Sequence, residues 1–140
     1  MEIWKHTIVS FFLAALFYNY YGFSALLILA GGVLIDADHY LWHALKFKRY
    51  GIRECYHYCA VTTIKNNWKH VKGSLFIFHN VEFLTLALVL PFYSAPAIMF
   101  TVGLLSHYAL DFIWHAKFIK KPTHAISFFA WLLKDFKKFK

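Results

Sequence analysis

Four long apolar segments constrain the fold of this chain more than any other feature of its sequence. They cover about 7–22, 22–36, 73–93 and 95–116, and only three prolines and six glycines occur in the whole chain. Runs of this length are too long for short buried strands, and a membrane-spanning helix needs about 20 mainly apolar residues. We therefore expect an all-α fold, an integral membrane bundle of about four transmembrane helices. The first two segments are short and are expected to form a tilted or shallow hairpin.

Composition and length agree with a small membrane protein. Hydrophobic residues make up 60% of the 140 residues, whereas soluble domains usually contain 45–50% apolar residues. A chain of this length predicts one domain, residues 1–140. The first segment ends in Tyr18, Asn19, Tyr20 and Tyr21, which offer no small-residue cleavage site, so we expect it to be retained rather than removed as a signal peptide.

The basic residues predict the orientation in the membrane. The two short turns, near Tyr20 and Ser94, hold no lysine or arginine, whereas all fifteen basic residues lie before the first segment, in the central loop or after the fourth segment. The positive-inside rule then predicts a multi-pass protein of the inner cell membrane, with both termini and the central loop in the cytoplasm. The net charge of +8 indicates contact with anionic lipids of the inner leaflet, and no nucleic-acid-binding motif is present.

Two basic segments outside the apolar runs have open interpretations. The central loop around 49–70 and the tail 124–140 could each form an amphipathic helix on the membrane surface or a plain solvated segment. Cys55 and Cys59 stand four residues apart in the loop, and a cytoplasmic location favours reduced thiols over a disulfide. A metal site formed by these cysteines with His57 is a weaker alternative, since no second pair stands at a zinc-finger distance.

Ionisable side chains gather at one predicted depth. At about 1.5 Å of rise per residue, His79 lies about 10 Å from Lys72, and Asp111 lies about 9 Å from Lys117, so both fall in the cytoplasmic third of the membrane. The residues of this layer are His6, Asp36, Asp38, His39, His79, Glu82, His107 and Asp111. Such a side chain is costly in a membrane unless it pairs, lines a wet cavity or binds a metal, so each is a functional candidate.

The spacing of these residues favours a metal site. His107 and Asp111 stand at i,i+4, and Asp36 and His39 stand at i,i+3, so each pair shares a helix face. Imidazoles combined with carboxylates suit zinc, manganese or iron, and the charge of the cation would offset the cost of burying aspartates. The alternative is a set of Asp–His hydrogen bonds that only hold helices together.

The order of His6, LIDADH, FHN and GLLSHYALD resembles the YdjM-like family of membrane-bound metal-dependent hydrolases. That family has an early histidine followed by LPDxDH, HRxxTHS and HxxxD elements, and the resemblance covers most of the chain. It implies a metal site, with zinc the first choice, held by His6, Asp36, Asp38, His39, His79, His107 and Asp111. The family is also similar in ligand type to zinc-dependent phospholipase C and P1-type nucleases.

Two positions depart from the family pattern. Ile35 replaces the proline of LPDxDH, and Ser74 stands where the first histidine of HRxxTHS would fall, with Glu82 as the candidate to replace it. The prediction is a membrane-embedded hydrolase of phosphoesters or other esters, with a phospholipid as the most accessible substrate and with Asp38 and Glu82 as catalytic residues. The alternative is a non-catalytic metal-binding or structural four-helix membrane protein.

Overall fold

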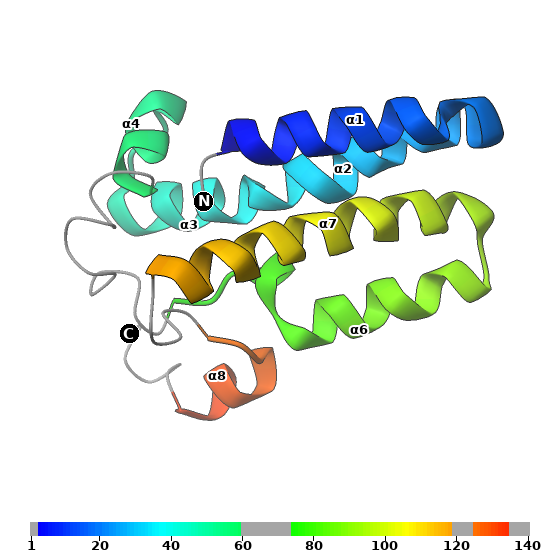
Figure 1. Cartoon of the computed structure of the whole chain (residues 1–140). Coiled ribbons are helices and arrows are strands. Elements are labelled where there is room, and N and C mark those ends of the chain that lie inside the picture. The colour runs from blue at the N-terminus through cyan, green and yellow to red at the C-terminus, as the bar shows by residue number, and fades with distance from the viewer. Residues whose placement is uncertain (1–2, 60–73, 119–124, 135–140) are drawn as a thin grey trace. The chain divides into compact units, whose positions relative to one another are not determined.

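The computed structural model describes residues 3–59, 74–118 and 125–134, and every regular element in these ranges is helical. The all-α prediction is thus confirmed for the described chain (Figure 1). The chain divides into two compact units, one formed by Met1–Ile35 and Thr85–Lys120 and the other by Asp36–Leu84 and Lys121–Lys140. The sequence predicted one domain, and each unit is described in turn below.

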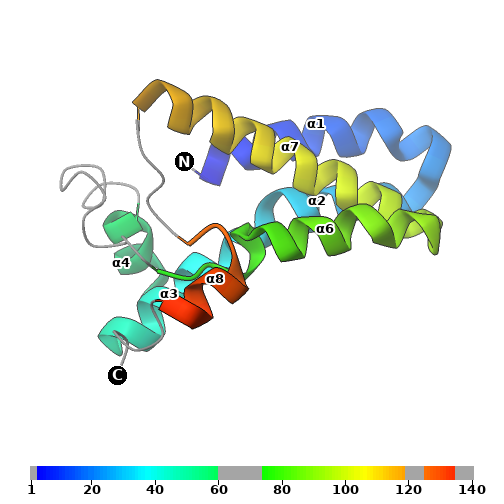
Figure 2. The ribbon, with the colours of Figure 1, turned by 90° about the horizontal axis from the view of Figure 1, so that it is seen from below.

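The first unit packs α1 (Ile3–Tyr21) antiparallel to α2 (Leu27–Val33) and α7 (Ala95–Phe118), and the latter two helices run in the same direction (Figure 1). Helix α1 ends at Gly22, whose φ of 55° lies in the left-handed region that glycine adopts without steric cost. A 3₁₀ turn, η1 (Gly22–Leu26), then leads into α2. Helix α7 runs along α2, as both views show (Figures 1 and 2).

Glycines allow the backbones of α2 and α7 to come into direct contact. A Cβ atom on Gly103 would lie 2.2 Å from the carbonyl oxygen of Ile28, and one on Gly31 would lie 2.1 Å from that of Phe100. On the other side of α2, a Cβ on Gly32 would lie 1.9 Å from Oγ of the buried Ser10 in α1. Small residues are the usual means of close helix packing in membranes. The apolar core of the unit is formed by Ala14, Ile28 and Met99.

The second unit contains shorter helices. They are η2 (Leu34–Asp36, whose last residue begins the unit), α3 (Ala37–Phe47), α4 (Ile52–His57), η5 (Ile77–His79), the start of α6 (Val81–Val89) and α8 (Phe128–Lys134). Trp42 of α3, Phe76 and Tyr58 form its aromatic core. Two backbone hydrogen bonds join its distant segments, from the amide of Ala125 to Ser74 and from that of Val81 to Ile126.

Two helical stretches of the described chain are long and apolar enough to cross a membrane, one within Ile3–Phe47 and one at Ala95–Ala116. The predicted third segment forms a shorter apolar helix, Val81–Phe92, in which α6 is followed by the 3₁₀ turn η6 (Leu90–Phe92). At 1.5 Å per residue this helix is about 18 Å long, against about 30 Å of hydrocarbon. The bundle of four transmembrane helices therefore stays a prediction.

The two basic segments are described only in part. Helix α4 occupies the start of the central loop and α8 the middle of the tail, whereas residues 60–73, 119–124 and 135–140 lie outside the described residues. Cys55 and Cys59 are free thiols whose Sγ atoms lie 4.0 Å apart. The Cys55 thiol also lies 3.9 Å from the backbone oxygen of His39.

Candidate metal centres

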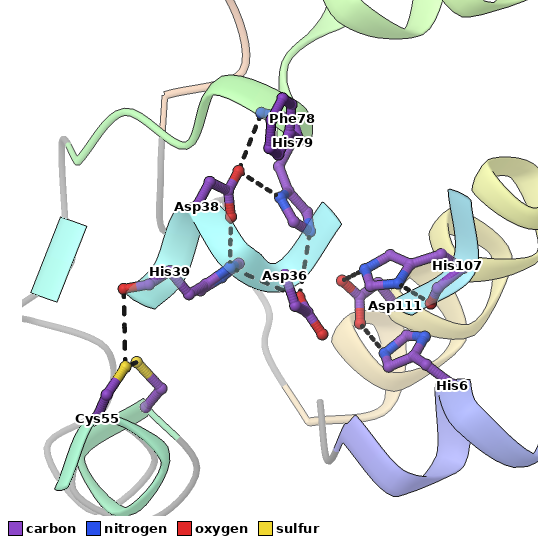
Figure 3. Close-up of polar contacts among 11 residues, drawn as sticks. His6, Asp36, Asp38, His39, Cys55, Phe78, His79, His107 and Asp111 are labelled. Carbon is purple, nitrogen blue, oxygen red and sulfur yellow. Dashed lines mark hydrogen bonds and ion pairs between the residues drawn. The ribbon is translucent and has the colours of Figure 1, made fainter. Parts of the chain in front are cut away.

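The first group of predicted ligands lies within the first unit and combines residues from both ends of the chain. His6 of α1 and His107 of α7 are 1% and 0% exposed, and Asp111 lies one turn beyond His107. His6 Nε2 lies 3.3 Å from Asp111 Oδ1, and His107 Nε2 lies 3.4 Å from Asp111 Oδ2 (Figure 3). His6 of α1 and His107 of α7 therefore both face the carboxylate of Asp111, the i,i+4 partner of His107.

The orientation of His107 is fixed by a backbone carbonyl. Its Nδ1 lies 2.9 Å from the oxygen of Gly32, which can only accept a hydrogen bond, so Nδ1 carries the proton. Nε2 then carries a lone pair that is directed toward Asp111. Metal-ligating histidines commonly have this arrangement, in which the other ring nitrogen donates a hydrogen bond to a carbonyl. The ring of His6 stacks on that of His107, with centroids 3.8 Å apart.

The spacing of these atoms fits a tetrahedral ion. Ligands at about 2.0–2.1 Å from a tetrahedral zinc lie about 3.3–3.4 Å from one another. The two observed nitrogen–oxygen distances, 3.3 and 3.4 Å, have this value and exceed the usual length of a charge-assisted hydrogen bond. Nδ1 of the buried His6 has no hydrogen-bond partner within the described chain, and its Nε2 is directed at Asp111. The three side chains can therefore hold a metal ion.

The second group lies within the second unit and is centred on Asp38, which is 3% exposed. Asp38 Oδ1 accepts a hydrogen bond from Nδ1 of His39 at 2.8 Å, and Oδ2 accepts one from Nδ1 of His79 at 2.9 Å. The amide of Phe78 donates to the same Oδ2 at 2.9 Å (Figure 3). The ring of His39 stacks on Phe76 with centroids 4.1 Å apart, which fixes its plane. These contacts satisfy a buried carboxylate that would otherwise be costly.

Asp36 faces the nitrogen of His79 that Asp38 leaves available. Asp36 Oδ1 lies 3.6 Å from His79 Nε2, and it lies at the same distance from His39 Nδ1. Because Asp38 holds Nδ1 of His79, the lone pair of Nε2 is directed toward Asp36. The sequence predicted Asp38 as both ligand and catalytic residue. Its three hydrogen bonds fit a positioning residue that sets the tautomer and orientation of two histidines.

Glu82, the second predicted catalytic residue, contacts the tail. Its Oε1 accepts a hydrogen bond from the Ser127 hydroxyl at 2.6 Å, and its Oε2 accepts one from the amide of Phe128 at 3.0 Å. The amide of Phe129 lies 3.4 Å from the same Oε1 as the Ser127 hydroxyl. The Glu82 carboxylate therefore binds the start of α8, and its predicted catalytic role stays a prediction.

Two further histidines lie beside aromatic rings. His43 is 2% exposed and packs near the rings of Phe47 and Tyr58, with centroids 5.0 and 5.3 Å away. His115 lies beside Trp114. Ser74, where the family pattern has a histidine, is buried and accepts the backbone bond from Ala125 described above. The proline position of that pattern is filled by the buried Ile35.

Sequence reasoning missed the partners that orient the histidines. The carbonyl of Gly32 and the amide of Phe78 belong to the backbone, which carries no signal in the residue type. Phe76 stands three residues before His79 and could have been suspected only from its aromatic ring. Comparison of the chain with protein-family models, curated proteins and solved structures finds no match.

Proposed function

We propose that this protein is a membrane-embedded, metal-dependent hydrolase that acts on a phosphoester at the cytoplasmic face of the inner membrane. The observation that carries the proposal is the His6, His107 and Asp111 group, with two buried imidazoles at ligand spacing around one carboxylate. The Asp36 and His79 pair, oriented by Asp38, supports it from the second unit. Zinc is the first choice because imidazole and carboxylate ligands suit it.

Exposure of the long helices supports a membrane location. Only 17% of the most apolar stretch within Ile3–Phe47 is buried, and 28% of that within Ala95–Ala116, whereas a core helix of a soluble protein would be mostly buried. Phe11 and Phe12 on α1 are 66% and 67% exposed. An apolar surface of this extent needs a lipid environment or a partner. We take lipid as the environment because the basic residues are confined to the predicted cytoplasmic segments.

The residues of the two groups have distinct roles in this proposal. A divalent cation at these ligands would polarise a phosphoryl oxygen and lower the pKa of a bound water. His6, His107 and Asp111 would hold the cation in the first unit, and the Gly32 carbonyl sets the tautomer of His107. In the second unit Asp38 accepts a hydrogen bond from Nδ1 of His79, so Nε2 of that ring would be the coordinating atom. The phosphoester class rests on the resemblance and on the predicted nearness of the ligand layer to the inner headgroups.

The proposal predicts that purified protein contains zinc and hydrolyses phosphodiesters in a chelator-sensitive manner. Asp38→Asn should lower metal affinity about 10–100-fold, the usual effect of losing a partner that orients a ligating histidine. Glu54→Gln is the matched control, because this exposed carboxylate pairs with Arg49 and lies in neither group. The measurements are metal content by elemental analysis and hydrolysis of bis(p-nitrophenyl) phosphate and phospholipids.

Three outcomes would decide between the functions. Bound zinc with chelator-sensitive hydrolysis supports the hydrolase. Bound zinc without hydrolysis of any phosphoester or carboxyl ester favours a metal-binding module. No metal after incubation with zinc, manganese or iron would leave a structural membrane protein, held together by Asp–His hydrogen bonds.

Topology provides an independent prediction. Reporter fusions at residue 60 should report a cytoplasmic location, and fusions at residue 94 should report the opposite side, because all fifteen basic residues lie outside the two short turns. Phosphatase and fluorescent-protein reporters at both positions make the measurement. A cytoplasmic residue 94 with an external residue 60 would reverse the orientation and move the proposed substrate to the outer face.

A further inference from the structure

The turn that carries His79 is too short to set its own position. Helix η5 covers only Ile77–His79, and the residues on both sides of it have extended backbone. The amide of His79 bonds the backbone oxygen of Phe76 at 3.1 Å. Hydrogen-bond geometry in 3₁₀ helices is poorer than in α-helices, and such runs are seldom long. Contacts from outside the turn therefore decide how firmly His79 is held against Asp38.

One stretch of the C-terminal tail, residues 125–129, contacts the chain on both sides of this turn. Before the turn, the backbone oxygen of Ser74 accepts a hydrogen bond from the amide of Ala125 at 3.0 Å. After it, the amide of Val81 donates to the backbone oxygen of Ile126 at 2.8 Å. All four residues belong to the second unit. Two neighbouring tail residues thus hold both ends of the segment that carries the turn.

A side-chain contact extends this attachment into α8. The Ser127 hydroxyl donates to Oε1 of Glu82 at 2.6 Å and accepts a hydrogen bond from the amide of Ala130 at 3.2 Å. The other oxygen of Glu82 accepts a hydrogen bond from the amide of Phe128. Hydrogen bonds to a carboxylate are roughly twice as strong as those between neutral groups. Because Glu82 stands three residues after His79, its bonds to the tail are the strongest restraint on that side of the turn.

Helix α8 also lies beside Asp38. Trp131 of α8 and Asp38 line the same pocket, together with Ile77 of the turn. The amide of Trp131 bonds the backbone oxygen of Ser127 at 3.0 Å, so the residue that binds Glu82 also begins the helix that carries Trp131. Loss of the Ser127 contacts would therefore disturb the surroundings of Asp38 as well as the segment that follows the turn.

We propose that residues 125–129 form a tail clamp that positions the second ligand group, with Ser127 and Glu82 as positioning residues that act through His79. The inference rests on the proposed hydrolase function, because it gives the tail a part in holding the metal ligands of the second unit. With the clamp in place, Asp38 accepts the hydrogen bond from Nδ1 of His79, and Nε2 is the nitrogen left for a cation. Without it, the turn shifts and the ring exchanges tautomers, which lowers the affinity for a cation.

The tautomer of His79 can be measured without any metal. Full-length, metal-free protein in phosphatidylcholine nanodiscs carries isotope-labelled histidine, and its ring nitrogen resonances are recorded by NMR at about pH 8, where free histidine is neutral. His79→Gln assigns the His79 resonances. In wild type, Nδ1 of His79 should carry the proton. Ser127→Ala should move the Nε2 resonance of His79 toward its protonated value, and Ser127→Thr, which keeps the hydroxyl, should restore the wild-type spectrum.

The resonances of His107 are the internal control for this measurement. The Gly32 carbonyl sets the tautomer of His107 within the first unit, and the tail clamp belongs to the second unit. Ser127→Ala should therefore leave the His107 resonances in place. Ser24→Ala is the matched control variant, because it removes a serine hydroxyl from η1 in the first unit and should leave the resonances of both histidines unchanged.

Zinc affinity measures the consequence for a bound cation. The Asp111→Asn background lacks the carboxylate of the first group, so competition titration with a coloured chelator then reports on the second group. Ser127→Ala should weaken zinc binding about three- to tenfold, the size expected from loss of one net hydrogen bond. Glu82→Gln should have a similar effect. The double variant should lie close to the weaker single one, because both changes act on the same bond.

The outcomes bear separately on the clamp and on the hydrolase. Unchanged His79 resonances in Ser127→Ala, or equal movement of the His79 and His107 resonances, would overturn the clamp and leave the hydrolase standing. Moved resonances with unchanged zinc affinity would also overturn the clamp, because His79 would then be a ligand that does not depend on the tail. If wild type binds no zinc while Ser127→Ala moves the His79 resonances as expected, the hydrolase fails and the clamp is supported.

Discussion

Asp111→Asn is expected to remove the metal from the first unit while the helices remain folded. The change keeps the shape of the side chain but removes the charge between His6 and His107, whose nitrogens lie 3.3 and 3.4 Å from its oxygens. Loss of a partner that only orients a ligand costs about 10–100-fold in metal affinity, so loss of a ligand should cost on the order of a hundredfold or more. Zinc titration monitored by competition with a coloured chelator measures this affinity.

Folding and metal binding are measured separately for this variant. Circular dichroism should be the same for wild type and Asp111→Asn, because an amide can still hydrogen-bond to an imidazole in a packed helix interface. Hydrolysis should fall together with zinc content. Unchanged zinc affinity would remove Asp111 from the site and favour the reading in which these side chains only hold α1 and α7 together.

Gly103→Ala is expected to be strongly destabilising for the first unit. The added Cβ would lie 2.2 Å from the carbonyl oxygen of Ile28 and 2.9 Å from its Cα, and backbone atoms cannot move aside as a side chain can. Helices α2 and α7 would have to separate. Overpacking of this kind typically costs 1–3 kcal/mol, and we expect a loss of about 3 kcal/mol because the contact is with backbone. Unfolding of detergent-solubilised protein should then shift down by about 10 °C.

The control for this experiment is Gly51→Ala. A Cβ on Gly51 would meet Cβ of Glu54 at 3.5 Å, an ordinary contact, and the φ of −72° suits alanine. Its melting temperature should stay within about 2 °C of wild type. Gly103→Ala should also weaken zinc binding, because His107 of α7 depends on the Gly32 carbonyl of α2. A wild-type melting temperature for Gly103→Ala would show that the two helices are less closely packed than described.

The sequence predicted element type well and element length less well. Long apolar runs with few prolines indicate helix whatever their surroundings, and the described chain is helical throughout its regular elements. The short turn predicted near Tyr20, between the first two segments, is found at Gly22, where α1 passes into η1. Hydropathy did not separate the extended residues 74–76 from the helix that follows, so the third segment was drawn too long.

The structure brings the predicted ligands together in two groups, and their function as ligands stays a prediction. Helical spacing was enough to pair His107 with Asp111, since i,i+4 neighbours share a face. Spacing cannot show which of two nearby carboxylates accepts the hydrogen bonds that orient the histidines. Asp36 and Asp38 differ by two positions, yet Asp38 bonds two histidines and an amide while Asp36 lies 3.6 Å from His79. Asp38 has these bonds because the fold brings Phe78 and His79, 40 and 41 residues later in the chain, into contact with it.

Position 32 limits how this protein can drift in evolution. The absence of a side chain there lets α2 lie against Ser10 of α1, and the carbonyl of the same residue sets the tautomer of His107. Any other residue at position 32 would place its Cβ 1.9 Å from the Ser10 hydroxyl oxygen and 3.0 Å from the Ser10 Cβ, so the hydroxyl would have to turn away or α1 and α2 move apart beside the carbonyl that orients His107. A change at Gly32 should therefore be tolerated more readily once Ser10 has become smaller, which makes the order of mutations, and not merely their sum, decide which sequences are reachable.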